Sequence, residues 1–293
     1  MIETESNKLN MDIQDKLRKI KLIIFDLDGT LLADDGTVGD KTRALIKELK
    51  KHDVRFSFAS GRLHSAITAL ASDLDIKAPL ISLDGAMIKS HPENKMLFEY
   101  PLKSKHVLRA ISYAEKNFVN IALCHGDAIY YTEHNSLVPS LMDKYGARYE
   151  EIAEYDGHVN NTLEIVFAGD NKEAIKYIRG RLDIPYVFGV ETSYYKSQRH
   201  SGIYYLEVHR KGASKKTGVY KLLKHYKIKI HQTAVVGDWY NDLALFQTDA
   251  LKVALANAVP EIKNYADIEL KKSNNEDGTG EFLEMVLNAK VGK

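Results

Sequence analysis

The fold is decided by residues 22–30, which read LIIFDLDGT. Leu22–Phe25 is a short apolar run of the kind that forms a buried strand, and polar residues follow it directly. Asp26 and Asp28 therefore stand at the carboxyl end of a strand, where ligands and catalytic groups gather in open α/β sheets. Residues two apart in an extended segment point the same way, so both carboxylates can face one substrate. For this stretch alone, an Asp-Gly turn, part of a calcium loop and a receiver-type acidic pocket remain alternatives.

Two regions, residues 21–86 and 211–293, alternate short apolar segments with segments of helical periodicity. This alternation predicts an α/β core with a parallel sheet covered by helices on both faces. The further expected strands are Val54–Ala59, Leu80–Leu83, Thr233–Val236 and Leu251–Ala254. The expected helices lie around Ala44–Leu49, at Leu63–Leu74 and Lys215–Tyr226, from Asp242 onward and near Glu281–Leu287.

The middle of the chain, residues 87–210, follows another pattern. Its strands are rich in tyrosine and alternate polar with apolar residues, which is typical of half-exposed antiparallel strands. We therefore expect an α+β domain inserted into the core. The expected strands there include Met96–Tyr100, Ile129–Thr132, Leu163–Ala168 and Ile203–His209. Before the core, residues 1–20 form an N-terminal extension in which Ile13, Leu17 and Ile20 have the spacing of a short amphipathic helix.

Composition limits the classes of function. The 293 residues are 44% hydrophobic and 28% charged, as in globular proteins, and the net charge of +1 gives no indication of a nucleic-acid partner. The single cysteine, Cys124, excludes an intrachain disulfide, and its apolar surroundings favour a small buried residue over a nucleophile. No run approaches the ~18 apolar residues of a membrane helix, and the N-terminus lacks a signal core. We expect a cytoplasmic protein with no membrane partner and no obligate protein partner.

Two further segments place phosphate-binding chemistry after predicted strands. Ser60 and Gly61 precede an expected helix, where a hydroxyl and free backbone N–H groups can hold phosphate, although Ser60 could simply cap that helix. Lys215 stands near another helix start, where the helix dipole disfavours a cation, so it faces either an anion or solvent.

A third segment, Gly237–Asp242, reads GDWYND and follows another expected strand. Asp238, Asn241 and Asp242 bring oxygen ligands of the type that suits Mg²⁺, which is usually held by one or two carboxylates. A polar turn with Asn241 or Asp242 as helix cap is the alternative.

In this order, the segments DLDGT, SGR, Lys215 and GDWYND resemble the four motifs of the haloacid dehalogenase superfamily of phosphatases. The resemblance is to the Cof-type branch, which carries a C2-type α+β cap between the second and third motifs. The later segments VALANA (residues 253–258) and NEDG (residues 275–278) also resemble that branch. The resemblance covers nearly the whole chain after about Lys21, and it implies a Rossmann-like parallel-sheet core with residues 87–210 as the cap.

The resemblance also implies a role for each motif residue. Asp26 is the implied nucleophile and Asp28 the general acid/base, and Mg²⁺ is held by Asp26, the backbone carbonyl of Asp28 and Asp238. Asp242 supports the metal site. The implied phosphate-binding residues are Ser60, Gly61, Lys215 and Asn241. The implied activity is Mg²⁺-dependent hydrolysis of a small phosphorylated metabolite (a sugar phosphate, nucleotide or cofactor phosphate) through an aspartyl-phosphate.

Three positions depart from the branch's pattern. Trp239 stands where small residues are commoner, Asp84 where asparagine is usual, and Ala256 where glycine is frequent. The bulk of Trp239 and the extra charge of Asp84 affect the expected substrate range. A phosphomutase of the same superfamily and a non-catalytic metabolite-binding protein are the alternative functions.

Overall fold

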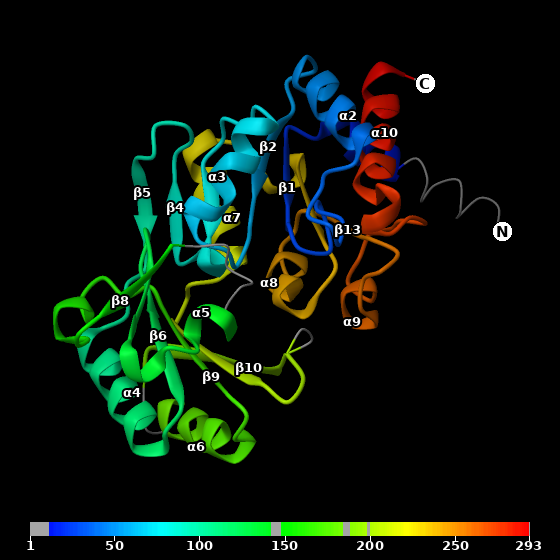
Figure 1. The fold of residues 1–293 in the computed structure, drawn as a ribbon. Coiled ribbons are helices and arrows are strands. Elements are labelled where there is room, and N and C mark those ends of the chain that lie inside the picture. The colour runs from blue at the N-terminus through cyan, green and yellow to red at the C-terminus, as the bar shows by residue number, and fades with distance from the viewer. Residues whose placement is uncertain (1–11, 142–147, 184–187, 198–199, 293) are drawn as a thin grey trace.

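The computed structural model describes residues 12–141, 148–183, 188–197 and 200–292. Two sheets lie one above the other in Figure 1, and we call them the central sheet and the outer sheet. The central sheet is parallel, with strand order β14-β13-β12-β1-β2. Its strands are β1 (Leu22–Phe25), β2 (Arg55–Phe58), β12 (Thr233–Gly237), β13 (Leu251–Ala254) and β14 (Ile268–Glu269).

Helices cover both faces of the central sheet because its strands are apolar on both sides. In β1, Ile23 and Phe25 pack into one apolar cluster and Leu22 and Ile24 into another on the opposite face. The first cluster includes side chains from the helical residues 12–19, α2 (Asp40–Lys50), α3 (His64–Asp73) and α10 (Gly278–Val291). The second includes side chains from α7 (Lys215–Tyr226), α8 (Leu243–Phe246) and α9 (Pro260–Lys263). The predicted α/β architecture is confirmed, although the helix expected from Asp242 is a single turn.

A hairpin extends the central sheet at its β2 edge. β3 (Leu80–Ser82) joins β2 through a parallel bridge between Ala59 and Ile81, and it pairs with β4 (Met87–Lys89), which pairs with β5 (Met96–Glu99). Ile88 of β4 belongs to the same apolar cluster as α7, and Phe98 of β5 packs against that cluster. The first strands of the expected insertion are therefore paired with β3 at the edge of the central sheet, and they are not strands of the outer sheet.

The outer sheet has the order β10-β11-β9-β6-β7-β8 and is antiparallel except between β7 and β8. Its strands are β6 (Asn120–Cys124), β7 (Ile129–Thr132), β8 (Tyr149–Ile152), β9 (Glu164–Gly169), β10 (Val190–Lys196) and β11 (Tyr204–Arg210). Helices α4 (Ser104–Asn117) and α6 (Lys172–Leu182) share an apolar cluster with one face of this sheet. They lie below it in Figure 1, away from the central sheet.

The other face of the outer sheet packs against the central part of the molecule. We call the buried apolar residues between them the junction cluster. Its members include Leu63, Leu83, Ala86 and Met87 from the central part, and Ala122, Cys124, Val166 and Tyr205 from the outer sheet. Cys124 has no exposed surface, which confirms its expected burial. The two parts therefore meet through apolar packing, and α5 (Val138–Leu141) contributes Val138 to it.

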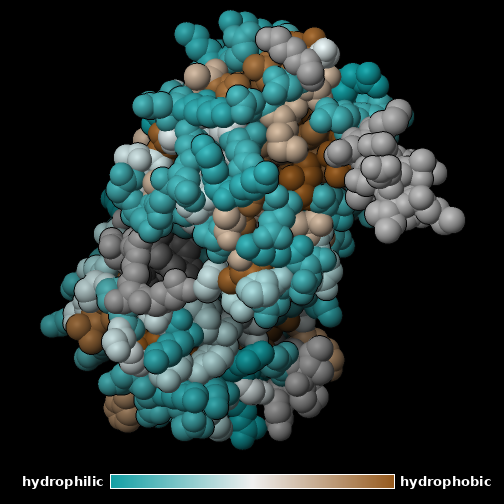
Figure 2. Space-filling view, turned by 90° about the vertical axis from the view of Figure 1, so that its right-hand side faces the viewer, coloured by the Kyte–Doolittle hydropathy of each residue, from teal (hydrophilic) through white to brown (hydrophobic). Residues whose placement is uncertain are grey.

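The surface of the molecule is mainly polar. The face of the molecule in Figure 2 is mainly hydrophilic, with apolar side chains in small patches. Among the described residues, no helix is both long and apolar enough to cross a membrane.

Candidate active site

The aligned ends of neighbouring strands bring the motif residues together. β1 lies between β12 and β2, and Phe25 is in register with both Val236 and Phe58. Asp26 and Asp238, each at or just past its strand's carboxyl end, therefore lie on one edge of the sheet, as expected for parallel strands. Both are buried, at 3% and 5% exposure.

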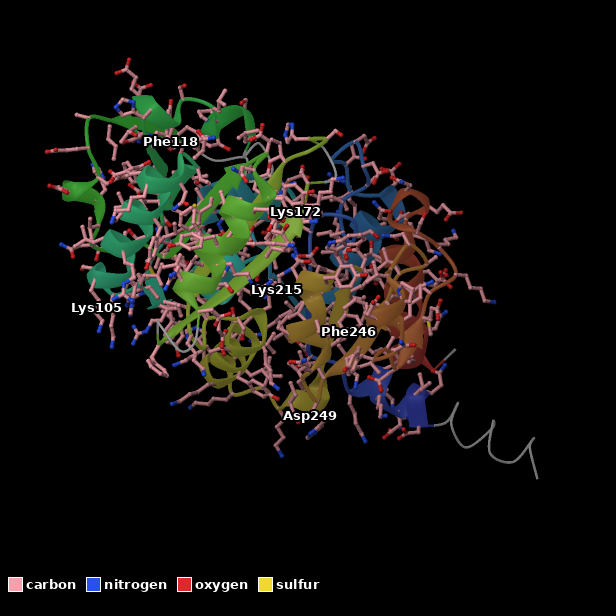
Figure 3. All side chains as sticks on the ribbon, turned by 90° about the horizontal axis from the view of Figure 1, so that it is seen from below. Lys105, Phe118, Lys172, Lys215, Phe246 and Asp249 are labelled. Atoms are coloured by element: carbon pink, nitrogen blue, oxygen red, sulfur yellow. The ribbon has the colours of Figure 1, made fainter. Side chains whose placement is uncertain are left out.

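Lys215 lies at the centre of this group. It begins α7, whose N-cap Ser214 accepts a hydrogen bond from the backbone N–H of Thr217. The buried Lys215 ammonium donates to Oδ1 of Asp26 at 2.6 Å and to Oδ1 of Asp242 at 2.7 Å. Lys215, which is labelled in Figure 3, is 1% exposed. Burial alone would lower its pKa, but the Asp242 and Asp26 carboxylates outweigh that effect and raise the pKa well above its usual value. Lys215 is therefore a fixed positive charge that faces anions, as one of the two sequence alternatives predicted.

The acids around Lys215 carry more negative charge than it compensates. Asp26, Asp238 and Asp242 each offer a carboxylate oxygen within 4.8 Å of the others. Burial, reinforced by the charge of Asp242, raises the pKa of Asp26 well above its usual value and that of Asp238 to about 7. When all three buried carboxylates are ionised, the one ammonium leaves two negative charges uncompensated, and a divalent cation would balance them. The donor set consists of hard oxygens, so these residues fit Mg²⁺.

The two acids of the GDWYND segment have different tasks. Asp242 uses Oδ1 for Lys215 and Oδ2 for the backbone N–H groups of Asp238, at 3.0 Å, and Trp239, at 3.3 Å. Both of its oxygens are thus occupied in holding the loop and the lysine. Asp238 accepts a hydrogen bond from the hydroxyl of Thr30 at 2.6 Å and lies 3.3 Å from the amide Nδ2 of Asn257. These contacts hold Asp238 where one of its oxygens lies within 4.8 Å of Asp26, and the supporting role of Asp242 stays a prediction.

The close approach between Asp238 and the DLDGT turn requires a glycine. Gly29 has a φ of +81°, which L side chains rarely adopt, and a Cβ there would lie 2.5 Å from Oδ2 of Asp238. The turn after β1 therefore brings its backbone against the acid from β12.

The other three predicted phosphate ligands, Ser60, Gly61 and Asn241, lie in different surroundings from one another. Ser60 is buried, its Oγ accepts from the backbone N–H of Arg62 at 3.1 Å, and its own N–H donates to the carbonyl of Ile81. Gly61 lies against Asp84, because a Cβ on Gly61 would be 3.1 Å from the Asp84 Oδ2. Asn241 is exposed on the short turn Tyr240–Asp242, and its contact with phosphate stays a prediction.

Sequence reasoning missed the partner of Asp28. The Arg62 guanidinium donates two hydrogen bonds to that carboxylate, which is 54% exposed, and the contact raises the pKa of Arg62. The SGR segment indicated that its arginine lies near the acids after β1, because it follows the neighbouring strand. Spacing alone does not show which of these acids the arginine contacts.

Asp84 lies on a strained turn beside Lys215. Leu83 and Asp84 both have φ of +47°, and the Asp84 N–H donates to the carbonyl of Ser60 at 3.0 Å. A Cβ on Gly85 would overlap the backbone carbonyl of Ser214, so this turn packs closely against the start of α7. Asp84 Oδ1 consequently lies 3.6 Å from the Lys215 ammonium. The expected extra charge near the site is therefore present.

Known proteins are similar to this chain along almost its whole length. A family model for haloacid dehalogenase-like hydrolases matches residues 23–283. Phosphatase YwpJ of Bacillus subtilis is 24% identical, with 92% of this chain and 100% of YwpJ covered. The Bacillus subtilis protein YitU, named a 5-amino-6-(5-phospho-D-ribitylamino)uracil phosphatase, is 24% identical over 89% of this chain and 96% of its own. A crystal structure of a haloacid dehalogenase-like hydrolase from Bacteroides thetaiotaomicron has a TM-score of 0.79 at 25% identity, and covers 91% of this chain and 99% of that one.

Proposed function

The chain belongs to the haloacid dehalogenase-like hydrolases and is a phosphatase of that family, and we propose that it hydrolyses a small phosphorylated metabolite through an aspartyl-phosphate on Asp26. The observation that supports this proposal most directly is the position of Asp26. Its carboxylate is buried at the end of β1, bonded to Lys215 and within ligand distance of Asp238 and Asp242. An anionic nucleophile surrounded in this way has the cationic neighbour it needs to approach a phosphate.

The chain's own side chains divide the chemistry. Asp26 attacks phosphorus, and Lys215 holds Asp26 in place and offsets negative charge on the transferred oxygens. Asp28 protonates the leaving oxygen and then deprotonates the water that cleaves the acyl-phosphate. Asp26, the Asp28 carbonyl and Asp238 would hold Mg²⁺, which polarises the phosphoryl oxygens and neutralises charge when bound. The phosphate would contact Ser60, Gly61, Lys215 and Asn241.

The outer sheet acts in this proposal as a cap over the site. Its β11 strand places side chains beside Asp84, which is itself 3.6 Å from Lys215, so the leaving group of a bound phosphate ester would face this strand. The core consists of residues 21–86 and 211–293, and the inserted segment is 87–210, although its first hairpin packs with the core. In the outer sheet, Tyr131 and Tyr195 pack against the junction cluster, whereas Tyr130 and Tyr194 belong to or pack against the apolar cluster on the opposite face. We place the enzyme in the cytoplasm.

The test is a screen for released inorganic phosphate with and without Mg²⁺. The panel contains sugar phosphates, nucleotides and cofactor phosphates, together with the ribitylaminouracil phosphate for which YitU is named. Mass spectrometry of acid-quenched turnover mixtures should find a phosphoryl group on the peptide that contains Asp26. A phosphorylated product without release of phosphate would identify a mutase instead, and no turnover of any compound would contradict the proposal.

A further inference from the structure

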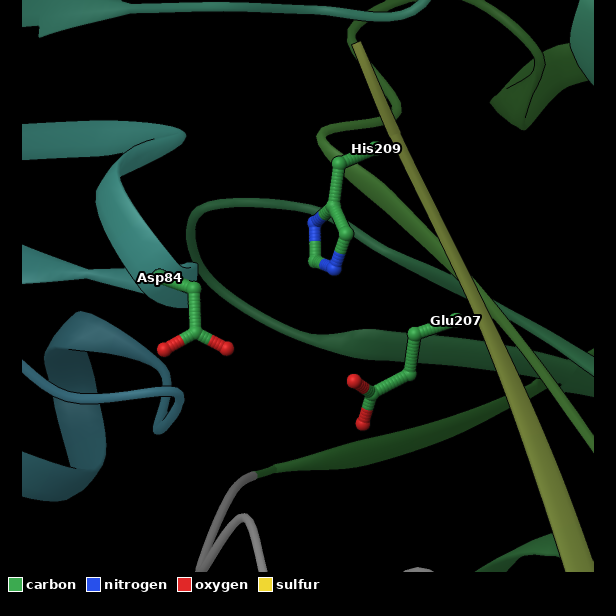
Figure 4. Close-up of side chains that lie close together, drawn as sticks. All are labelled: Asp84, Glu207 and His209. Carbon is green, nitrogen blue, oxygen red and sulfur yellow. The ribbon is translucent and has the colours of Figure 1, made fainter. Parts of the chain in front are cut away.

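A second group of metal-binding side chains lies between the central and outer sheets. Asp84 comes from the turn after β3, and Glu207 and His209 come from β11. Glu207 and His209 are two residues apart in a strand and therefore point to the same face of the outer sheet. Figure 4 shows the three side chains pointing toward one space, and each offers a ligand atom within 4.8 Å of the others.

Charge at this place favours a cation. Glu207 and His209 are 6% and 7% exposed, and the Asp84 side chain is 25% exposed, so two carboxylates lie close together with little water. The nearby Lys215 ammonium donates to Asp26 and Asp242, while Asp84 Oδ1 lies 3.6 Å away and receives no hydrogen bond from it. The negative charge of Asp84 is therefore only partly compensated.

Two buried atoms of the group are without partners. Within the part of the chain that the structure describes, neither Asp84 Oδ1 nor His209 Nδ1 has a hydrogen-bond partner. A buried polar atom without a partner is costly, and such atoms are rare in folded proteins. The His209 side chain is more than nine-tenths buried, its Nδ1 has no partner, and one of its ring nitrogens lies close to both carboxylates, so the imidazole is available as a metal ligand. This observation is independent of the acidic charge.

We propose that Asp84, Glu207 and His209 form a binding site for a divalent transition-metal ion such as Zn²⁺, separate from the Mg²⁺ site at Asp26 and Asp238. One imidazole nitrogen with two carboxylates suits Zn²⁺ or Mn²⁺, whereas Mg²⁺ prefers oxygen ligands alone. Ligand atoms around a tetrahedral zinc lie about 3.4 Å apart at bond lengths of about 2.1 Å. In the structure the three ligand atoms lie within 4.8 Å of one another, so a metal ion would draw them closer together.

The neighbourhood of the site supports ligation. The hydroxyl of Tyr195 donates to Oε1 of Glu207 at 2.5 Å, in the way that ligating carboxylates are usually oriented by a further hydrogen bond. The ion would join one residue of the core to two residues of the outer sheet. This site does not depend on the proposed phosphatase mechanism, because none of its three ligands is a proposed catalytic group.

The experiment is a titration of the full-length protein with Zn²⁺ and with Co²⁺ in the presence of saturating Mg²⁺. We expect one equivalent of Zn²⁺ that Mg²⁺ does not displace, and a Co²⁺ absorption spectrum that indicates a nitrogen ligand. Glu207→Gln and His209→Gln should each weaken this binding at least ~10-fold, the loss that even a supporting residue of a metal site typically causes. His106→Gln is the matched control, because His106 on α4 is 6% exposed and its Nε2 also has no partner among the described residues. It should leave binding unchanged.

An Asp238→Asn variant separates this proposal from the proposed function. That variant should lose Mg²⁺ binding and retain the Zn²⁺ equivalent. The proposal is overturned if Mg²⁺ displaces all bound Zn²⁺, or if the Zn²⁺ equivalent that Mg²⁺ does not displace survives both the Glu207 and His209 substitutions. It is also overturned if no Zn²⁺ binds. If the two substitutions then change the KM for a phosphorylated metabolite, the group is instead a contact for the leaving group.

Discussion

The guanidinium of Arg62 holds the carboxylate of Asp28 with two hydrogen bonds, from Nε to Oδ2 at 2.9 Å and from Nη2 to Oδ1 at 2.5 Å. Both oxygens of the group proposed to move protons therefore share one partner. Arg62 follows β2 and Asp28 follows β1, so the contact also ties two neighbouring strand ends together. Arg62 is in this view a positioning residue, which decides where the Asp28 carboxylate points.

Replacing Asp28 should affect poor leaving groups most. Asp28→Asn removes the proposed proton donor, so we expect a loss of about 10²–10⁴-fold on an alkyl phosphate. The loss should be smaller on 4-nitrophenyl phosphate, which leaves without protonation. Arg62→Gln should change the ratio of the two kcat values in the same direction, but less. Equal losses on both substrates for Asp28→Asn would exclude an acid role.

Replacing Asp26 should abolish turnover and leave the fold intact. In Asp26→Asn the amide keeps the shape of the side chain but is a very poor nucleophile toward phosphorus. Phosphate release and circular dichroism spectra measure the two effects. Asp73→Asn, at a surface acid paired with Arg43, is the control and should remain active. Substantial activity of pure Asp26→Asn would refute the covalent mechanism.

Gly29 and Gly36 allow the cost of a left-handed backbone to be measured separately from the cost of crowding Asp238. Gly29 and Gly36 both have a φ of +81°, but only Gly29 faces Asp238, whereas a Cβ at Gly36 would meet nothing within 4 Å. Each change to alanine should cost about 1–2 kcal/mol of stability for the left-handed backbone. Gly29→Ala should lose more, and it should also weaken Mg²⁺ binding because it displaces Asp238. Denaturant unfolding measures the loss of stability, and Mg²⁺ titration measures the loss of affinity. Equal stability and equal Mg²⁺ affinity of the two variants would mean that the close approach of Gly29 to Asp238 is unimportant.

The metal-free protein should lose stability as the pH rises from 3.8 to about 7. Burial raises the pKa of Asp238 from 3.8 to about 7, so the folded state holds a proton that the unfolded state releases. This contribution is fully present below pH 3.8 and is lost by about pH 7, and it amounts to at most about 4 kcal/mol. We expect the difference in unfolding free energy between wild type and Asp238→Asn, measured in chelator, to fall over this window. A difference that is constant with pH would contradict the assigned protonation.

Removing the outer sheet should impair selectivity more than chemistry. We expect a variant in which a flexible linker replaces residues 102–210, and which therefore keeps the β4–β5 hairpin, to lose its preferred metabolite far more than 4-nitrophenyl phosphate. Because the excision uncovers Leu83 and Met87 of the junction cluster, folding has to be shown first by circular dichroism. Equal losses from a folded variant would assign the insertion to stability.

The parallel central sheet and the meeting of Asp26, Lys215, Asp238 and Asp242 could be predicted from the sequence because both depend on local patterns. The apolar run Leu22–Phe25 and the acids after it determine one strand and its polar end whatever the rest of the chain does. The β4–β5 hairpin was assigned to the insertion because alternation in a strand does not show which sheet it joins. The approach of Glu207 and His209 to Asp84 was not predicted. It depends on how β11 packs against the turn after β3, which lies more than 120 residues away in the sequence.

The burial of Cys124 in the junction cluster has a practical consequence. Its thiol is the only one in the chain and has no exposed surface while the outer sheet rests on the core. A thiol-reactive reagent can then label the protein only when the two parts separate or the protein unfolds locally. The labelling rate, followed with and without Mg²⁺ and a phosphate analogue, would therefore measure opening of the native enzyme without an introduced probe.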